Sequence, residues 1–251
     1  MILKDLAAAI VFFTRIPVWK IYNVPAENYT RMIYFWPFTG WITSGITVAA
    51  WLAFSALFPP MVAVILALLT RILVTGALHE DGLGDFLDGF GGGKSKEAIL
   101  RIMKDSHTGS FALVGLIFYF VLLIATLQSI PEHMLPLVIF AADPFSKFAA
   151  TIMMNILPYA RPDEESKTKI SYLNLKWWQF VISAFFGLMP VCFLGLKFLP
   201  AIIAGIVIML CVTYTLKKRI KGYTGDTCGA TALMVELGFY LTTVIIITKM
   251  L

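Results

Sequence analysis

The chain is 251 residues long, and 59% of its residues are hydrophobic while only 14% are charged. Soluble domains contain about 45–50% apolar and about 25% charged residues, so this composition excludes an ordinary soluble protein and indicates a membrane protein. The net charge of +5 comes with no basic face carrying interleaved aromatic residues. We therefore expect a lipid bilayer as a partner and no nucleic acid.

The N-terminal residues predict a helix that lies at the membrane surface. The apolar run from Leu6 to Phe13 ends at Arg15 and Pro17, so it is too short to cross a bilayer. No small-residue cleavage site follows it, which argues against a signal peptide. An amphipathic interfacial helix fits this pattern.

Seven later segments are apolar enough to cross a bilayer, which takes about 20 residues each. They leave no room for a separate soluble domain. The predicted fold is thus an all-α polytopic integral membrane protein, with residues 1–251 forming a single membrane-embedded domain. The segments are 33–58, 61–78, 110–130, 134–157, 177–196, 199–216 and 229–248.

The distribution of positive charge predicts the orientation. Segments 1–32, 79–109, 158–176 and 217–228 would lie on one side, and they hold 16 of the 20 Lys and Arg residues. Positively charged loops are retained in the cytoplasm. We therefore expect a multi-pass protein of the plasma (inner) membrane with these four segments on the cytoplasmic side.

The segment 79–89, HEDGLGDFLDG, carries the strongest sign of chemistry. In a helix, Asp81, Asp85 and Asp88 follow i, i+4, i+7 spacing and project from one face. Three carboxylates this close repel one another unless a cation offsets their charge, and oxygen ligands suit Mg²⁺. His79 fits a base or a group hydrogen-bonded to a ligand. Glu80 points away from this face, so we expect it to be a solvated or salt-bridged side chain.

Two following elements fit phosphate binding. Gly91 and Gly92 allow a backbone to approach a phosphate, although a flexible hinge after a helix explains them equally well. Lys104, Asp105 and Ser106 precede the next apolar segment. Lys104 and Asp105 could contact a phosphate and a metal there, or form an interfacial ion pair.

Further charges lie at membrane depth, where they are costly and usually functional. Arg15 and Arg71 are suited to bind a diphosphate through bidentate contacts, with snorkelling of Arg71 to the interface as the alternative. Lys147 follows Asp143 at i, i+4, which suits either a structural ion pair or a cavity-lining one.

Two acids accompany the last apolar segment. Asp226 precedes it, and Glu236 lies inside it. We add both to the candidate metal ligands, with an internal hydrogen-bond partner as the alternative for Glu236. Together, these acidic and basic residues are the types that a site for a metal-bridged diphosphate uses.

These residues carry a family likeness. Segments 13–17 (FTRIP), 79–92 (HEDGLGDFLDGFGG), 101–112 (RIMKDSHTGSFA) and 222–230 (GYTGDTCGA) occur in the order found in the cobalamin synthase family, the adenosylcobinamide-GDP ribazoletransferases. The chain resembles that family over essentially its whole length.

The resemblance implies a Mg²⁺-dependent transferase of vitamin B12 biosynthesis. Its substrates would be adenosylcobinamide-GDP and α-ribazole or α-ribazole 5′-phosphate, and its products adenosylcobalamin or its phosphate and GMP. The family pattern carries over to His79, Asp81, Asp85, Asp88, Lys104, Asp105, Ser106 and Asp226, and the other candidates come from the residue patterns above; together they give the following expected roles. His79, Lys104 and Asp105 act in catalysis; Arg15, Arg71, Gly91, Gly92, Ser106 and Lys147 bind substrate; Asp81, Asp85, Asp88, Asp226 and Glu236 bind metal.

Three alternatives remain at this stage. The Asp85–Asp88–Gly89 pattern is also found in CDP-alcohol phosphotransferases, but their other elements are absent. Membrane prenyltransferases use aspartate-rich helices, yet a second such motif is missing. An ion-coupled transporter would use Asp143, Lys147 and Glu236, but it would place acids near the midplane, whereas most lie at the cytoplasmic edge.

Overall fold

The computed structural model describes residues 2–161 and 174–249, and these form helices without a strand. One isolated bridge pairs Tyr159 with Tyr223. The α-helices are α1 (Ile2–Phe13), α2 (Ala26–Tyr29), α3 (Trp36–Ser55), α4 (Pro60–Thr75), α5 (Leu78–Gly92), α6 (Lys96–Lys104), α7 (Ser110–Gln128), α8 (Leu135–Ile156), α9 (Trp177–Cys192), α10 (Leu199–Arg219) and α11 (Gly225–Thr248). In the described part of the chain, 3-10 turns occur at η1 (Val18–Lys20), η2 (Met32–Phe35) and η4 (Leu196–Phe198).

A helix occupies each of the seven predicted segments, and the all-helical polytopic fold is confirmed. Within the described ranges, five helices are long and apolar enough to cross a bilayer: Met32–Ser55, Ser110–Gln128, Leu135–Ile156, Leu196–Arg219 and Gly225–Thr248. The other two, α4 and α9, have 16 residues each. A helix of that length spans about 24 Å, less than the hydrocarbon core of about 30 Å. Five spans, or six if α4 and α5 count as one, therefore meet the length criterion instead of seven.

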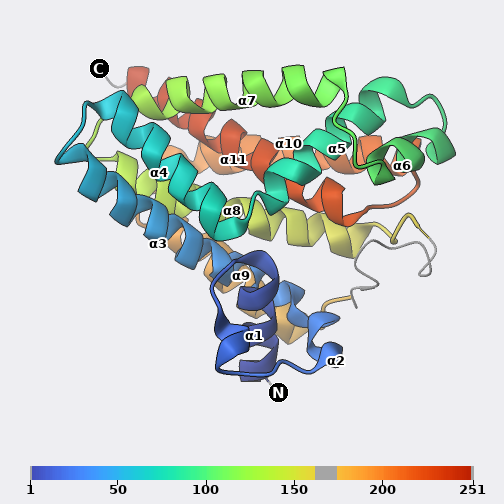
Figure 1. The fold of residues 1–251 in the computed structure, drawn as a ribbon. Coiled ribbons are helices and arrows are strands. Elements are labelled where there is room, and N and C mark those ends of the chain that lie inside the picture. The colour runs from blue at the N-terminus through green and yellow to red at the C-terminus, as the bar shows by residue number, and fades with distance from the viewer. Residues whose placement is uncertain (1, 162–173, 250–251) are drawn as a thin grey trace.

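The core of the bundle is built around α11. Figure 1 shows this helix running between α7 and α8, with α5 and α10 beside it, and it packs on α5, α8 and α10. Most side chains of α8 are also buried. In both helices the buried set includes charged residues, Glu236 on α11 and Lys147 on α8. The interior of this bundle is therefore apolar but not free of charge.

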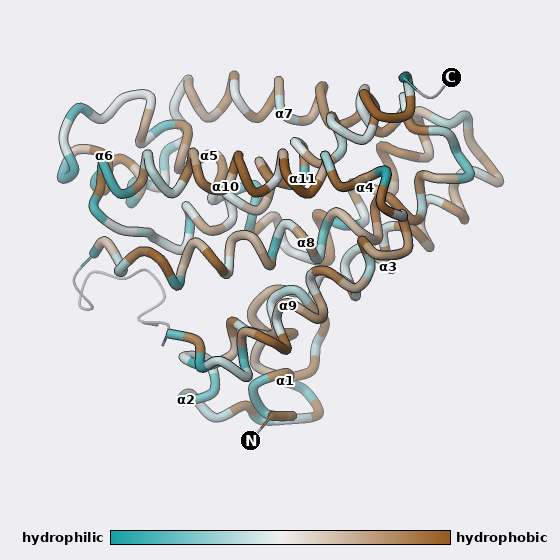
Figure 2. The backbone as a smooth tube through the Cα atoms, turned by 180° about the vertical axis from the view of Figure 1, so that it is seen from behind, coloured by the Kyte–Doolittle hydropathy of each residue, from teal (hydrophilic) through white to brown (hydrophobic). Residues whose placement is uncertain are grey.

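The predicted cytoplasmic segments meet at one end of the bundle. Tyr223 accepts a hydrogen bond from the Ala160 amide (2.8 Å) and donates its own amide to the Pro158 carbonyl (2.9 Å). Arg219 donates to the carbonyl oxygen of Gly93 across 2.7 Å. Figure 2 shows hydrophilic residues along α6 and the segments beside it at this end. These contacts bring together segment 79–109, the described part of segment 158–176 and segment 217–228; their cytoplasmic location and the grouping of segment 1–32 with them stay predictions.

The N-terminal helices form a small layer against the bundle, held by one buried acid. The carboxylate of Asp5 is 1% exposed and accepts hydrogen bonds from Asn28 (2.6 Å) and from the Tyr34 hydroxyl (2.9 Å). Arg31 lies 3.8 Å from the same carboxylate. The predicted helix is present as α1, and its position at a membrane surface stays a prediction.

Candidate functional site

A sharp bend places the acidic helix. Helix α4 ends at Thr75, and Gly76 and Ala77 both have positive φ angles, 66° and 59°. Glycine adopts this conformation without steric cost, which makes it the usual residue at such a C-terminus. The amide of Arg15 donates to the carbonyl of Val74 across 2.6 Å and ties the N-terminal layer to the bend. Helix α5 then leaves at 90° to α4.

Two glycines let α5 and α11 approach closely. A Cβ atom on Gly82 would lie 2.7 Å from the backbone oxygen of Asp226, and a Cβ on Gly229 would lie 3.1 Å from the Cα of His79. Larger side chains at either position would push the helices apart. The contact brings Asp81 and His79 on α5 to the same pocket as Asp226 on α11.

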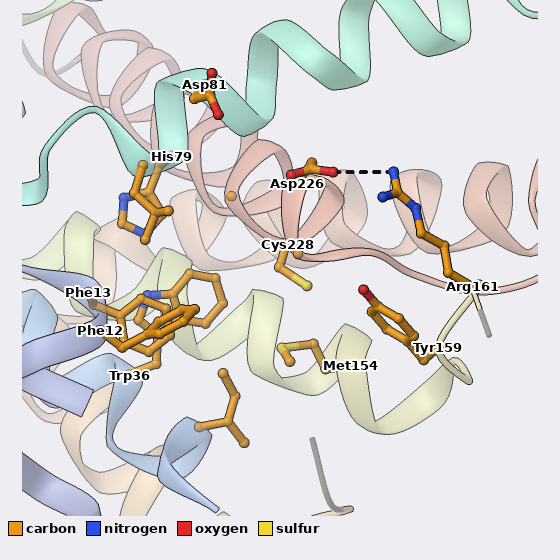
Figure 3. A pocket seen from close by; sticks show the side chains of 14 residues that line it. Phe12, Phe13, Trp36, His79, Asp81, Met154, Tyr159, Arg161, Asp226 and Cys228 are labelled. Carbon is orange, nitrogen blue, oxygen red and sulfur yellow. Dashed lines mark ion pairs between the residues drawn. The ribbon is translucent and has the colours of Figure 1, made fainter. Parts of the chain in front are cut away.

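That pocket has a volume of about 160 Å³, and Figure 3 shows it from close by. Asp81, Asp226 and Arg161 lie along one side, while Phe12, Phe13, Trp36 and Met154 lie along the other, with His79 between them. The remaining lining residues are Ile33, Leu78, Tyr159, Gly225, Cys228 and Gly229. The pocket therefore has a charged side and an apolar, largely aromatic side.

Arg161 supplies positive charge to the charged side. Its Nη2 atom lies 3.8 Å from Oδ2 of Asp226, and the residue is 6% exposed. The same Nη2 donates to the Leu100 carbonyl across 3.4 Å, while the buried Nε atom has no hydrogen-bond partner among the described residues. A guanidinium with a long ion pair and an unused N–H can accept an anionic group at modest cost.

The aromatic side is a set of nearly parallel rings. The rings of Phe13 and Trp36 lie 5.0 Å apart at 12°, and the His79 imidazole lies 5.7 Å from Trp36 at 12°. Phe12 meets Phe13 edge to face at 5.0 Å. These contacts fix the orientation of the His79 ring, and its buried Nε2 atom has no partner among the described residues.

A second polar cluster lies deeper, behind His79. Arg71 donates from Nη1 to Oε1 of Glu236 across 2.5 Å, and its Nη2 lies 4.0 Å from Oε1 of Glu80. The hydroxyl of Tyr240 donates to the same Glu236 oxygen across 2.8 Å. All of these side chains are buried. This ion-pair cluster joins α4, α5 and α11, and His79 borders it as well as the pocket.

The Asp143–Lys147 pair on α8 borders the same cluster. Lys147 donates to Asp143, and the hydroxyl of Thr43 on α3 donates to the other oxygen of that carboxylate across 2.5 Å. Lys147 is 4% exposed, so it lies inside the bundle. The spacing left two alternatives open, a structural ion pair or a pair that lines a cavity. Both apply, because Lys147 is paired with Asp143 and also lines the deeper cluster.

The five predicted metal ligands do not converge on one point. Asp81 and Asp226 line the pocket, and Asp85 is half-buried on α5 outside it. The carboxylate of Asp88 accepts hydrogen bonds from the Gly109 amide (2.6 Å) and the Ala112 amide (2.8 Å), so it caps α7. Glu236 is paired with Arg71, which agrees with the predicted alternative of an internal hydrogen-bond partner. No group of three or more His, Cys, Asp or Glu side chains arranged to hold a metal occurs among the described residues.

Other predicted site residues lie away from the pocket. Gly91 and Gly92 belong to the last turn of α5, so they are part of the helix and not a hinge after it, and phosphate binding by them stays a prediction. Lys104 is the last residue of α6, Asp105 and Ser106 follow it, and all three are exposed. The remaining predicted cations are also outside the pocket lining: Arg15 lies beside Gly76, and Arg71 and Lys147 line the deeper cluster.

Asp105 has a local partner. It accepts hydrogen bonds from the His107 amide (3.0 Å) and pairs with His107 Nδ1 at 2.7 Å. This pairing lowers the pKa of Asp105 and raises the pKa of His107 above its ordinary value. The Asp105 carboxylate is therefore engaged by His107 of the same surface loop.

Sequence reasoning missed Arg161 and did not foresee the burial of Glu80 and Trp36. Arg161 was counted only as a loop charge, because nothing in its neighbourhood marks it as buried. Glu80 was predicted to be solvated or salt-bridged; the salt bridge is confirmed, since Glu80 lies 4.0 Å from Arg71, but its burial, at 6% exposed, was not predicted. Trp36 was not among the predicted site residues, but it is 1% exposed and stacks on His79. Their burial depends on tertiary contacts that local spacing does not encode.

Comparison with known proteins identifies the family. The model of the cobalamin-5-phosphate synthase family matches residues 5–244. A Leptospira interrogans protein named adenosylcobinamide-GDP ribazoletransferase is 34% identical, with 93% of this chain and 92% of that protein covered. Proteins of the same name from Rhizobium etli (35% identical, 93% of each chain) and Clostridium botulinum (33%, 96% of this chain and 97% of the other) are similar too. No solved structure matches. The chain therefore belongs to the cobalamin-5-phosphate synthase family.

Proposed function

We propose that the protein transfers the adenosylcobinamide-phosphate group of adenosylcobinamide-GDP to α-ribazole or α-ribazole 5′-phosphate and releases GMP. Family membership supports the reaction, because the relatives carry the name of this transferase. The observation that carries the site is that His79, Asp81, Asp226 and Arg161 line one pocket. Acid, base and cation thus meet where phosphoryl-group transfer needs positioning and charge neutralisation.

In the proposed reaction a ribazole hydroxyl, taken as the 3′-OH, attacks the phosphorus that is joined to the cobinamide side chain. The new P–O bond forms as the bond from that phosphorus to the bridging oxygen of GMP breaks. His79 takes the hydroxyl proton, since its ring is held beside the pocket by Trp36. Arg161 binds the phosphate oxygens and stabilises the charge on departing GMP. Asp105 is not the base in this scheme, because it is exposed and paired with His107.

Mg²⁺ is the proposed cofactor, and Asp81 and Asp226 would hold it. The donor set fits this ion, because Mg²⁺ usually takes one or two protein carboxylates and completes its shell with water and substrate phosphates. Both acids border the pocket, and Asp81 is exposed. When bound, the ion would supply neutralisation of the diphosphate charge.

We propose a location in the plasma (inner) membrane with the pocket open toward the cytoplasm. The support is the clustering of positively charged loops at the end of the bundle that carries Arg161 and Asp226. Adenosylcobinamide-GDP and ribazole would then arrive from the compartment in which nucleotides are made.

The test is GMP release by purified protein supplied with both substrates and Mg²⁺. Wild-type protein should release GMP, and omission of Mg²⁺ should abolish the release. Asp226→Asn and His79→Gln should each lower kcat/KM by at least about 100-fold, a typical contribution of one acid–base or electrostatic group. The control is Glu132→Gln, which removes an exposed acid outside the pocket and should leave the rate unchanged. Full activity of Asp226→Asn at limiting Mg²⁺ would rule out its role as a ligand.

A further inference from the structure

The pocket is divided, and its apolar half is not explained by phosphate chemistry. Phosphate, Mg²⁺ and a proton acceptor account for Asp81, Asp226, Arg161 and His79. The opposite side is formed by Phe12 and Phe13 of α1, Trp36 of α3 and Met154 of α8, and Ile33 of η2 also lines the pocket. Five apolar side chains from four elements therefore face a site whose proposed chemistry is ionic.

The size of the pocket limits what can enter it. Its volume of about 160 Å³ is below the range of about 300–1,000 Å³ found for sites that enclose a whole drug-sized ligand. A corrin macrocycle is far larger than this, so the corrinoid has to lie outside the pocket. One ring system of a substrate, with its sugar and phosphates toward the charged side, is the part that fits.

The chemistry of the lining discriminates between the two flat bases that the proposed reaction involves. Guanine carries donors and acceptors on several edges, and burying them against Phe12, Phe13 and Ile33 would leave them without partners, which is costly. The base of ribazole is a dimethylbenzimidazole, which is apolar apart from one ring nitrogen. Flat apolar rings pack favourably against aromatic side chains, and Phe12, Phe13 and Trp36 all line the pocket.

We propose that the apolar half of the pocket binds the benzimidazole base of the ribazole acceptor, a subsite that rests on the proposed transferase function. The nucleoside then lies with its base among Phe12, Trp36 and Met154 and its ribose beside His79. That arrangement sets the ribose hydroxyl between the proton acceptor and the charged side where the diphosphate binds. The aromatic wall thus selects the acceptor, and the charged side selects the donor.

The first test is a comparison of KM values for the two substrates in Phe12→Ala and Met154→Ala. Loss of a base–aromatic stacking contact corresponds to about 5- to 150-fold weaker binding. We expect the KM for ribazole to rise by that factor in Phe12→Ala and by a smaller factor in Met154→Ala. The KM for adenosylcobinamide-GDP should stay within about twofold. The matched control is Phe38→Ala, since Phe38 packs on Phe35 and Phe186 and does not line the pocket.

A second measurement separates this inference from the reaction itself. Calorimetric titration of the full-length protein in detergent with α-ribazole alone should show binding that Phe12→Ala weakens and Phe38→Ala does not. Such binding would support the subsite even if wild-type protein released no GMP, which would refute only the reaction. The subsite is overturned if wild-type protein does not bind ribazole, or if Phe12→Ala raises the KM for adenosylcobinamide-GDP and leaves that for ribazole unchanged. Adenosine, with its polar base, should bind at least about tenfold more weakly than ribazole.

Discussion

Replacement of Asp88 distinguishes a helix cap from a metal ligand. Its spacing from Asp81 and Asp85 made it a predicted ligand, but in the structure its two oxygens accept hydrogen bonds from the Gly109 and Ala112 amides at 2.6 and 2.8 Å. These amides belong to the first turn of α7, where the positive end of the helix dipole also favours a carboxylate. Asp88 is 9% exposed, so water does not readily replace it.

The size of the effect follows from the two contacts. A hydrogen bond to a charged group contributes about 1.5–3 kcal/mol, and Asp88→Asn keeps one neutral acceptor while placing an amide NH₂ group against a backbone N–H. We expect a loss of about 2–3 kcal/mol. For a chain of this size that corresponds to a fall in Tm of about 4–12 °C. Asp88→Ala should destabilise the protein further, because both amides lose their partner.

The assay is thermal unfolding in detergent, combined with the Mg²⁺ concentration that gives half-maximal GMP release. Asp88→Asn should lower Tm and leave the Mg²⁺ midpoint unchanged at a temperature where the variant is folded. The matched control is Asp81→Asn on the same helix, which is exposed and lines the pocket. It should raise the Mg²⁺ midpoint and leave Tm nearly unchanged. An unchanged Tm for Asp88→Asn with a tenfold higher Mg²⁺ midpoint would refute the capping role.

Three further outcomes are expected. Glu236→Gln should destabilise the protein by about 3–5 kcal/mol in chemical unfolding, because it leaves the Arg71 charge buried, and adding Arg71→Met should recover more than half of that loss. Gly82→Ala places a Cβ atom 2.7 Å from a backbone oxygen of α11, so kcat/KM for GMP release should fall at least about tenfold as the helices separate. In NMR titrations the pKa of His107 should lie above its ordinary value and return to it in Asp105→Asn. Since that pKa is raised, the pairing is complete at lower pH and is lost as pH rises through the pKa of His107.

Composition and periodicity predicted the fold well, because each helix of a membrane protein satisfies its own backbone hydrogen bonds and must be apolar over its length. The segments that became α7, α8, α10 and α11 were found within a few residues of their limits. The prediction that 61–78 is one continuous helix was wrong, since helix α4 ends at Thr75 and the next helix leaves at 90° to it. Gly76 is the local signal for that turn, but hydropathy alone continues through it.

The candidate site was predicted in part. The segment 79–89 does form a helix, and it brings His79 and Asp81 to a pocket shared with Asp226, although their chemical roles remain predictions. Helical spacing predicts which side chains share a face of the helix, but it does not predict which other segments pack against that face. The N-terminus of α7 covers α5 at Asp88, and the pocket opens at Asp81, so two acids on one face have different environments. That difference comes from a contact between segments more than 20 residues apart.

The charged residues at membrane depth also show that the sequence alone does not predict every partner inside the bundle, and they show a physical reason for it. Arg71 was predicted to bind substrate and Glu236 to bind metal, yet these two residues pair with each other; the pairing of Lys147 with Asp143, which the i, i+4 spacing predicted, is confirmed. A buried charge is tolerated when it is paired and hydrogen-bonded, so mutual pairing satisfies the energetic demand that made each residue conspicuous. Arg161, which lies outside every predicted span, is instead held across the pocket from the aromatic rings with one N–H unused. In this protein the deep charges join α4 to α5 and α11 and α8 to α3, and the cation at the pocket comes from a connecting segment.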